Sequence, residues 1–272
     1  MKKYISFLLS VVLIATISCS RKPNYGSPNV DFESIKKSQS LWWTYHCKNI
    51  VLSSNFIALD HSSNRISKDL FLKNLTTGDF IPLKLTSTDS TYYKLYRLDR
   101  TSDKTIPDVI KIVADEASKN FRMEGTVFPK FDLKDLNGVE YTNEKTKGKT
   151  VVLKCWFIAC APCVAEFPQL NELVAKYKNR DDIVFVSLAF DSKEKLEPFL
   201  LKKPFRYAVV PDQKQFMFSD LDIKSYPTHI IIDKNGIIRK VVTSADEMID
   251  ALENDVLLNA DASRRSLAVN PK

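Results

Sequence analysis

The stretch of sequence that decides the fold, residues 150–168, reads TVVLKCWFIACAPCVAEFP. Its first part, Thr150–Ile158, is a nearly continuous apolar run of strand length, which is typical of a strand covered on both faces. From Pro162 onward, apolar residues recur at helical spacing. These residues are Val164, Phe167, Leu170, Val174 and Tyr177. The pair Cys160 and Cys163 therefore lies where a buried strand ends and a long helix begins.

The C-x-x-C spacing at this junction is typical of a redox-active pair. The first turn of a helix presents unpaired backbone N–H groups and a partial positive charge, and both stabilise a thiolate. A free thiol has a pKa of about 8.5, which such a position lowers to roughly 3.5–7.5. Because the thiolate is the nucleophile in disulfide exchange, we expect Cys160 to attack a target disulfide and Cys163 to resolve the mixed disulfide.

Metal binding is an alternative use of the two sulfurs. A structural zinc site needs four ligands, usually from two such pairs. The 3 histidines, His46, His61 and His229, repeat no ligand spacing. We therefore expect neither a zinc site nor a cofactor. A Cu(I) carrier or scaffold protein that uses the same cysteine pair stays open as an alternative function.

Three features beyond the cysteines carry a resemblance to a known family. Pro168 stands five residues after Cys163, where thioredoxins kink their first long helix. The sequence of Glu166–Pro168 matches the acid–aromatic–proline element of the ResA-like branch, and Tyr226–Thr228 is similar to the cis-proline loop. Together with the cysteine segment Lys154–Pro168, these features resemble the TlpA/ResA-like thioredoxins of the AhpC/TSA-redoxin superfamily.

The resemblance covers about residues 123–258, and it implies a thioredoxin-like fold in which the cis-proline loop faces the cysteines. In the family the backbone of this loop pairs with the substrate chain. The expected substrate-binding residues are therefore Tyr226, Pro227 and Thr228. A cis bond before Pro227 is plausible because it costs only about 0.5–1 kcal/mol relative to the trans form.

Glu166 is the one obvious acid near the cysteine pair, and two interpretations of it are open. It is either a catalytic proton acceptor that helps to deprotonate Cys163 during resolution, or an ordinary carboxylate near the start of a helix. The catalytic role needs a pKa that is raised by partial burial.

Two positions depart from the family pattern. Ala159 replaces the tryptophan that usually precedes the first cysteine, which is expected to open the surface beside Cys160. Lys154 stands where thioredoxins have a buried carboxylate. Because a buried lysine is costly, we expect its side chain to reach a polar edge.

Two further residues are expected to have structural roles. His229 is expected to hydrogen-bond within the hairpin that follows the loop, and Cys155 is expected to be a core residue.

The chain is expected to fold as an α/β thioredoxin-like domain over residues 123–259, with a central mixed sheet flanked by helices, preceded by a small α+β domain over residues 32–122. In the small domain, alternating runs at 80–85 and 92–96 favour strands, and residues 106–117 favour a helix. The polar residues 260–272 are expected to form a flexible tail.

Turn and helix-cap residues predict further elements of the second domain. Asn235-Gly236 predicts a tight hairpin turn, and Ser244 with a glutamate three residues later predicts the capped start of a last helix. Asp191 and Ser192 offer N-cap side chains for another helix, which Pro198 is expected to bend or interrupt.

The first residues have the pattern of an export signal. Lys2 and Lys3 precede an apolar stretch at 5–17 that is too short for a comfortable membrane-spanning helix. The stretch ends before Cys19 in a sequence that resembles a bacterial lipobox of the Bacteroidetes type. We therefore expect a lipoprotein signal peptide at 1–18, lipidation of Cys19 and a polar tether at 19–31.

Composition and charge limit the partners. The chain has 44% hydrophobic residues and a formal net charge of +7. Its basic residues are scattered and not interleaved with aromatics, so nucleic acid is not an expected partner.

The expected function is reduction of disulfides in other envelope proteins, with a membrane partner as electron donor and a lipid anchor in the inner or outer membrane. Thiol oxidation or disulfide isomerisation is the nearest alternative.

Overall fold

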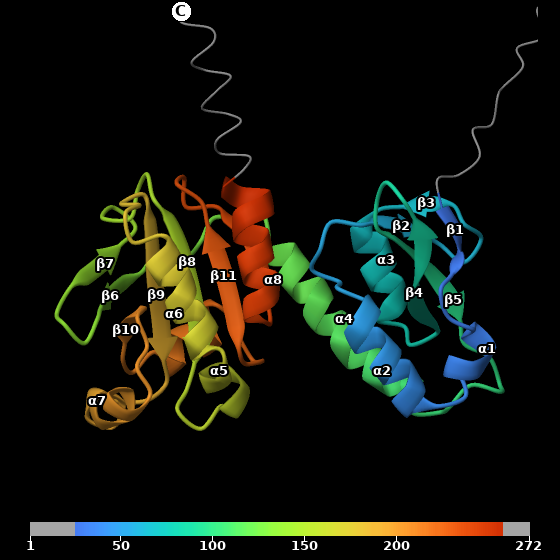
Figure 1. Cartoon of the computed structure of the whole chain (residues 1–272), viewed down its shortest axis with the longest axis horizontal. Helices are drawn as coiled ribbons and strands as arrows, with labels where there is room; N and C mark the ends of the chain where they lie inside the picture. Colours follow the sequence, from blue (N-terminus) through green and yellow to red (C-terminus); the bar gives the residue numbers. More distant parts are fainter. Residues whose placement is uncertain (1–24, 258–272) are drawn as a thin grey trace, which may run out of the picture.

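The computed structural model describes residues 25–257, and within that range the chain forms two five-stranded sheets and one two-stranded sheet (Figure 1). The predicted signal peptide, Cys19 and the tail at 260–272 lie outside the described residues. Each five-stranded sheet has its own hydrophobic core. The domain boundary between residues 122 and 123 stays a prediction. Among residues 25–257, no helix combines the length and the apolar character needed to cross a lipid bilayer.

The first sheet has the strand order β1-β4-β5-β2-β3. Its strands are β1 (Tyr25–Pro28), β2 (Ile57–Leu59), β3 (Arg65–Ile66), β4 (Phe80–Ser87) and β5 (Tyr92–Arg97). The helices of this part are α1 (Phe32–Ile35), α2 (Gln39–Asn49), α3 (Lys68–Leu75) and α4 (Ile106–Met123). Trp42, Phe71 and Ile81 are fully buried in the core that the sheet and helices share. The predicted strands at 80–85 and 92–96 are both present.

Part of the predicted tether is a strand. Tyr25–Pro28 pairs antiparallel with β4, and the Thr86 hydroxyl donates to the Ser27 carbonyl at 3.1 Å. The rings of Tyr25 and Tyr92 also pack together, with centroids 5.0 Å apart. β1 is an edge strand, where a proline is tolerated because one side of the strand needs no ladder hydrogen bonds. The linker-like composition of this segment therefore does not prevent strand pairing.

The second sheet is mixed and has the strand order β10-β9-β8-β11-β12. Its strands are β8 (Thr150–Trp156), β9 (Ile183–Ala189), β10 (Ala208–Val210), β11 (Thr228–Ile232) and β12 (Ile238–Val242). The two-stranded sheet consists of β6 (Asp132–Lys134) and β7 (Glu140–Thr142). The α-helices are α5 (Ala161–Ala165), α6 (Phe167–Lys176), α7 (Lys193–Lys202) and α8 (Ala245–Asp250), and η1 (Phe216–Asp220) and η2 (Ala251–Leu257) are π-helices. β8 is central, parallel to β9 and antiparallel to β11.

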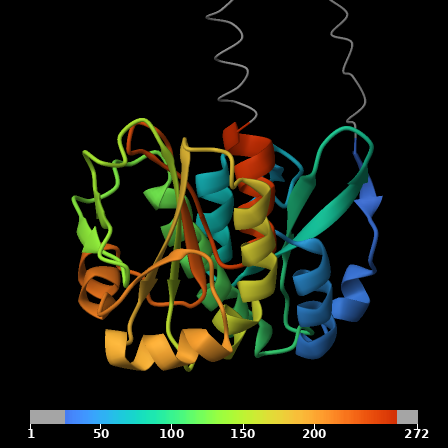
Figure 2. The same ribbon diagram turned by 60° about the vertical axis from the view of Figure 1, so that its left-hand side comes forward.

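Side chains of β8 alternate between two cores. Val152 packs with residues of α6 and α8, whereas Val151 and Leu153 belong to the core on the opposite face. The two helices lie side by side over the first of these faces (Figures 1 and 2). Lys154 and Trp156 follow Val152 at every second residue, so they point to the helix side as well.

Helix α4 continues to Met123, beyond the predicted end at 117, and it connects the two larger sheets (Figure 1). The chain that leaves it is bonded to the start of β12. The Gly125 N–H donates to the Ile238 carbonyl at 2.8 Å, and the Ile238 N–H donates to the Thr126 carbonyl at 2.9 Å. α4 also packs directly against β12.

The remaining local predictions are mostly confirmed. The turn at Asn235-Gly236 joins β11 to β12, and the Ser244 hydroxyl accepts the Glu247 N–H at 3.3 Å at the start of α8. Pro198 does not interrupt its helix, because α7 runs through it, and a bend at this residue stays a prediction. Pro198 is exposed, so the carbonyl that it leaves without a helical partner can bind water.

Candidate active site

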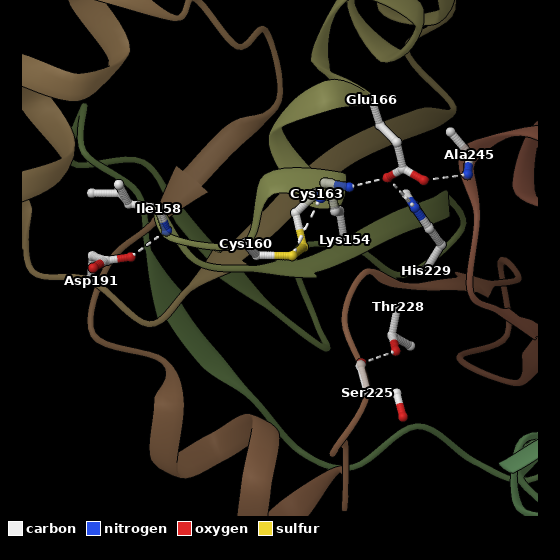
Figure 3. Close-up of a disulfide and its surroundings, with 10 residues drawn as sticks. All are labelled: Lys154, Ile158, Cys160, Cys163, Glu166, Asp191, Ser225, Thr228, His229 and Ala245. Atoms are coloured by element: carbon white, nitrogen blue, oxygen red, sulfur yellow. Dashed lines mark hydrogen bonds and ion pairs between the residues drawn. A yellow bond between two sulfur atoms is a disulfide. The ribbon is translucent and has the colours of Figure 1, made fainter. Parts of the chain in front are cut away.

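A disulfide joins Cys160 and Cys163 just after β8, in the first turn of α5 (Figure 3). Cys160 is the N-cap residue of α5, and the Cys163 backbone N–H donates to its Sγ at 3.3 Å. Cys160 is 6% exposed and Cys163 is fully buried. Of the two sulfur-bearing residues, only Cys160 is therefore open to a partner, which is consistent with its expected role as the attacking residue.

The predicted long helix is divided in two. α5 ends at Ala165, α6 begins at Phe167, and Pro168 lies in the first turn of α6. A proline cannot donate a hydrogen bond to the preceding turn, so the break occurs where the family kink is expected. Glu166 stands between the two helices, and this position directs its side chain toward β8 and β11 (Figure 3).

Three ionisable side chains, Lys154, Glu166 and His229, form a buried charged cluster on the Cys163 side of the disulfide (Figure 3). The Lys154 ammonium forms an ion pair with Oε2 of Glu166, and His229 Nε2 lies 3.0 Å from the same oxygen. The other oxygen, Oε1, accepts the Ala245 backbone N–H at 2.8 Å. Lys154 and His229 are fully buried.

Two expectations about this cluster are wrong. Lys154 does not reach a polar edge, because its strand is central in the sheet and its side chain points under α6. The carboxylate of Glu166 offsets the cost of its burial. His229 does not bond within the hairpin. It lies opposite Lys154 in the β8–β11 register, so both side chains reach the same carboxylate.

The charge states of the cluster follow from burial and pairing. Burial acts to raise the pKa of Glu166, but the hydrogen bond with His229 and the charge of Lys154 outweigh it and lower this pKa to about 2. Burial lowers the pKa of both Lys154 and His229. His229 is therefore neutral at pH 7, and its Nε2–H donates to the carboxylate. Its Nδ1 has no hydrogen-bond partner among residues 25–257.

The pKa found for Glu166 contradicts one part of its expected role. A proton acceptor needs a raised pKa, whereas the carboxylate beside the oxidised pair is strongly stabilised in its ionised form. The ionised carboxylate instead serves as the buried counter-charge of the Lys154 ammonium. A catalytic role for Glu166 in the reduced protein stays a prediction.

Acidification is expected to weaken the fold through Glu166. The pKa of this group falls from an ordinary value of 4.5 to about 2 in the fold. Its stabilising contribution is therefore complete above pH 4.5 and is lost as the pH falls toward 2. The effect is roughly 3 kcal/mol, since one pKa unit corresponds to about 1.36 kcal/mol.

Urea unfolding measures this contribution when the wild type and Glu166→Gln are compared at about pH 6 and at about pH 3. The other carboxylates titrate alike in both proteins, so the change in the stability difference between them reports on Glu166. The wild type should lose most of its advantage over the variant at the lower pH. An equal advantage at both pH values would show that Glu166 is not held ionised by its neighbours.

The expected substrate-binding loop lies beside the cysteines. The Tyr226-Pro227 peptide bond is cis, as predicted, and the Thr228 hydroxyl donates to the Ser225 carbonyl across it at 2.7 Å. The Tyr226 ring packs edge-on against Phe157, with centroids 5.5 Å apart, and joins the hydrophobic cluster that contains both cysteines. Through Tyr226 the cis-proline loop thus packs against the hydrophobic cluster that contains the disulfide, and substrate binding by the three loop residues stays a prediction.

An open cavity of about 670 Å³ is lined by the two residues that flank Cys160 in the chain, Ala159 and Ala161. It is lined mainly by apolar side chains, among them Ala159, Val164 and Phe199. This agrees with the expectation that the replacement of tryptophan at position 159 opens the surface there. The loop ahead of the disulfide is held by Asp191, whose carboxylate accepts the Ile158 N–H at 2.8 Å. Sequence reasoning assigned Asp191 to a helix cap instead.

The two other described cysteines are free thiols. Cys155 is a fully buried core residue, as expected, and burial raises the pKa of its thiol to about 12. Cys47 is exposed in α2. Among the described residues, no group of three or more His, Cys, Asp and Glu side chains is arranged to hold a metal ion.

A disulfide at a strand–helix junction, facing a cis-proline loop on a mixed sheet, defines a thioredoxin-like oxidoreductase. The comparisons agree. The AhpC/TSA family matches residues 125–241. The thiol-disulfide oxidoreductase ResA of Geobacillus kaustophilus is 30% identical over 119 residues, which cover 44% of this chain and 68% of the relative.

Two further proteins are similar to part of this chain. The thioredoxin-like protein YneN of Bacillus subtilis is 33% identical over 122 residues, 43% of this chain and 70% of the relative. A solved structure described as a thiol:disulfide interchange protein DsbE from Chlorobium tepidum is 29% identical, covers 50% of this chain and 96% of its own, and has a TM-score of 0.44. The chain belongs to the ResA-like thiol-disulfide oxidoreductases of the AhpC/TSA family. Residues 25–124 precede the segment that the family matches.

Proposed function

We propose that this protein is an exported thiol–disulfide oxidoreductase that reduces disulfides of other envelope proteins. The observation that carries the proposal is the Cys160–Cys163 disulfide, with a backbone N–H on the sulfur of its more exposed member and the cis-proline loop beside it. Membership in the ResA-like family supports the exchange chemistry. Electron flow toward the substrate is the direction that the family resemblance favours.

The reaction is a two-electron exchange that begins from the reduced dithiol. The Cys160 thiolate attacks one sulfur of the substrate disulfide, and the other substrate sulfur leaves as a thiolate that takes up a proton. Cys163 loses its proton and attacks the Cys160 sulfur, which releases the second substrate thiol. The substrate disulfide has then gained two electrons, and Cys160–Cys163 is oxidised. A membrane-bound dithiol donor must reduce it again before the next turnover.

Location in the envelope belongs to the same proposal. The basic and apolar residues before Cys19 support export and lipidation there, and disulfides persist outside the cytoplasm. The anchored protein would meet exported substrates at a membrane surface. Metabolic labelling with a fatty-acid probe tests this, because Cys19→Ser should remove the label while leaving the exchange reaction unchanged.

Trapping of the mixed disulfide tests the proposed function. With Cys163→Ser the second attack cannot occur, so Cys160 should hold its targets as covalent complexes that appear on non-reducing gels and disappear with a reductant. The matched control is Cys160→Ser, which keeps one thiol of the pair but should trap nothing. Equal trapping by both variants, or by neither in cells that express the protein, would contradict the proposal. Tight stoichiometric Cu(I) binding without insulin reduction would favour the carrier function instead.

A further inference from the structure

A cleft of about 200 Å³ separates helix α4 from the cis-proline loop. One wall comes from α4 and includes Asp115, Glu116 and Asn120. The opposite wall comes from residues on both sides of the Tyr226-Pro227 bond, including Ser225 and Thr228. Ser225 and Thr228 flank the cis bond, and the Thr228 hydroxyl bonds to the Ser225 carbonyl across it (Figure 3), so the cleft adjoins the loop along which the substrate backbone is expected.

An ion pair fixes the two walls to each other. Lys119 of α4 contacts the Asp222 carboxylate at 3.0 Å, and Lys224 contacts the same carboxylate at 2.9 Å. Asp222 has a φ of 49°, a left-handed conformation that non-glycine residues adopt rarely and that its two partners help to hold. The first half of the chain is thereby attached to the segment that leads into the cis-proline loop.

Asn120 is the observation that points to a ligand. It is only 9% exposed, and it lines the cleft. Its side-chain amide makes no hydrogen bond with any residue in the described range 25–257. The amide therefore faces the cleft with its donor and acceptor groups unused by the protein, and a polypeptide backbone offers both the acceptor and the donor that this side chain lacks.

We propose that α4 is part of the substrate-binding surface. A segment of the substrate protein passes along the cis-proline loop into this cleft, where Asn120 bonds to its backbone and the acidic wall attracts a lysine or arginine. The two lysines of the cleft already pair with Asp222, whereas Asp115 and Glu116 form no ion pair among the described residues. The carboxylates of Asp115, Glu116 and Asp222 together outnumber the two lysines, so the net charge of these groups is negative. This inference rests on the proposed function, and it assigns substrate recognition to the part of the chain that precedes the family segment.

Reduction of matched peptides by the full-length reduced protein tests the charge preference. The peptides contain one disulfide and differ only in a lysine or a glutamate at positions flanking the cysteines. We expect KM to be about five-fold lower for the lysine peptides, as two exposed charge interactions allow. The double variant Asp115→Asn, Glu116→Gln should abolish this preference. Asp108→Asn, which removes an acid from the first turn of the same helix outside the cleft, should retain it.

Asn120→Leu tests the backbone contact separately. Because the amide has no partner in the free protein, the variant should unfold at an unchanged or higher urea concentration. It should nevertheless raise KM for both peptides by about five-fold and leave the reaction with a small aromatic disulfide unchanged. A purely structural role for Asn120 would instead lower stability and leave KM unchanged, which would overturn the proposal.

The outcomes separate this inference from the function on which it rests. If the protein reduces both peptides and the small disulfide but shows no charge preference, recognition by α4 is wrong while the oxidoreductase function stands. If it reduces neither the peptides nor the small disulfide, the proposed function itself is contradicted.

Discussion

Cys160→Ser is expected to lower disulfide-reductase activity to the uncatalysed rate. A serine hydroxyl does not ionise near neutral pH, so the variant lacks the nucleophile for the first attack. The remaining Cys163 is fully buried and cannot replace it, because a substrate sulfur must reach the attacking atom. Insulin reduction, followed by the turbidity of the released chains, measures the loss.

Cys163→Ser is the informative comparison, because it removes the second attack and keeps the first. A rapid-mixing experiment with a coloured aromatic disulfide should show one equivalent of released thiol from this variant and none from Cys160→Ser. Cys47→Ser, which removes an exposed thiol from α2, should match the wild type. If Cys160→Ser still released a stoichiometric burst, the assignment of the nucleophile would be wrong.

The parts of the fold that could be predicted are those in which neighbouring residues determine the structure. The run from Thr150 to Ile158 has the length and apolar character of a buried strand, and Pro162 starts a helix just after it. Asn235-Gly236 closes a hairpin by its own backbone preference. The cysteine pair and the cis-proline loop were identified from short motifs, which preserve local geometry.

The charged cluster could not be predicted because its members meet only through tertiary structure. Glu166 is 12 residues from Lys154 and 63 from His229 along the chain. One signal was available: Val152, Lys154 and Trp156 share one face of a strand, so a lysine between two core residues must itself be buried. Following that alternation would have predicted a buried counter-charge on the helix above.

The role of the first sheet could not be read from the sequence for the same reason. The contact of Lys119 with Asp222 joins a helix of the first part to a loop of the second, and no local pattern marks either residue. Only the arrangement of α4 beside the cis-proline loop suggests that a small α+β unit ahead of a thioredoxin-like fold bears on substrate recognition.

Lys154→Met is expected to be the most destabilising single substitution in the charged cluster. It leaves the Glu166 carboxylate buried without its counter-charge, and removal of one partner of a buried ion pair costs about 3–5 kcal/mol. Methionine has a similar length and is apolar, so lost packing contributes little. Urea unfolding gives the change. The double variant Lys154→Met, Glu166→Gln should recover much of the loss, because no unpaired charge is then buried.

The pH dependence of this loss identifies its cause. The deficit of Lys154→Met should be greatest above pH 4.5, where Glu166 of the wild type is ionised in both the folded and the unfolded chain, and should shrink as the pH falls toward 2 and the carboxylate takes up a proton. Lys176→Met, which breaks the exposed pair with Glu253, should have a much smaller and nearly constant effect. A deficit for Lys154→Met that did not change with pH would mean that residue 154 stabilises the fold by packing and not by its charge.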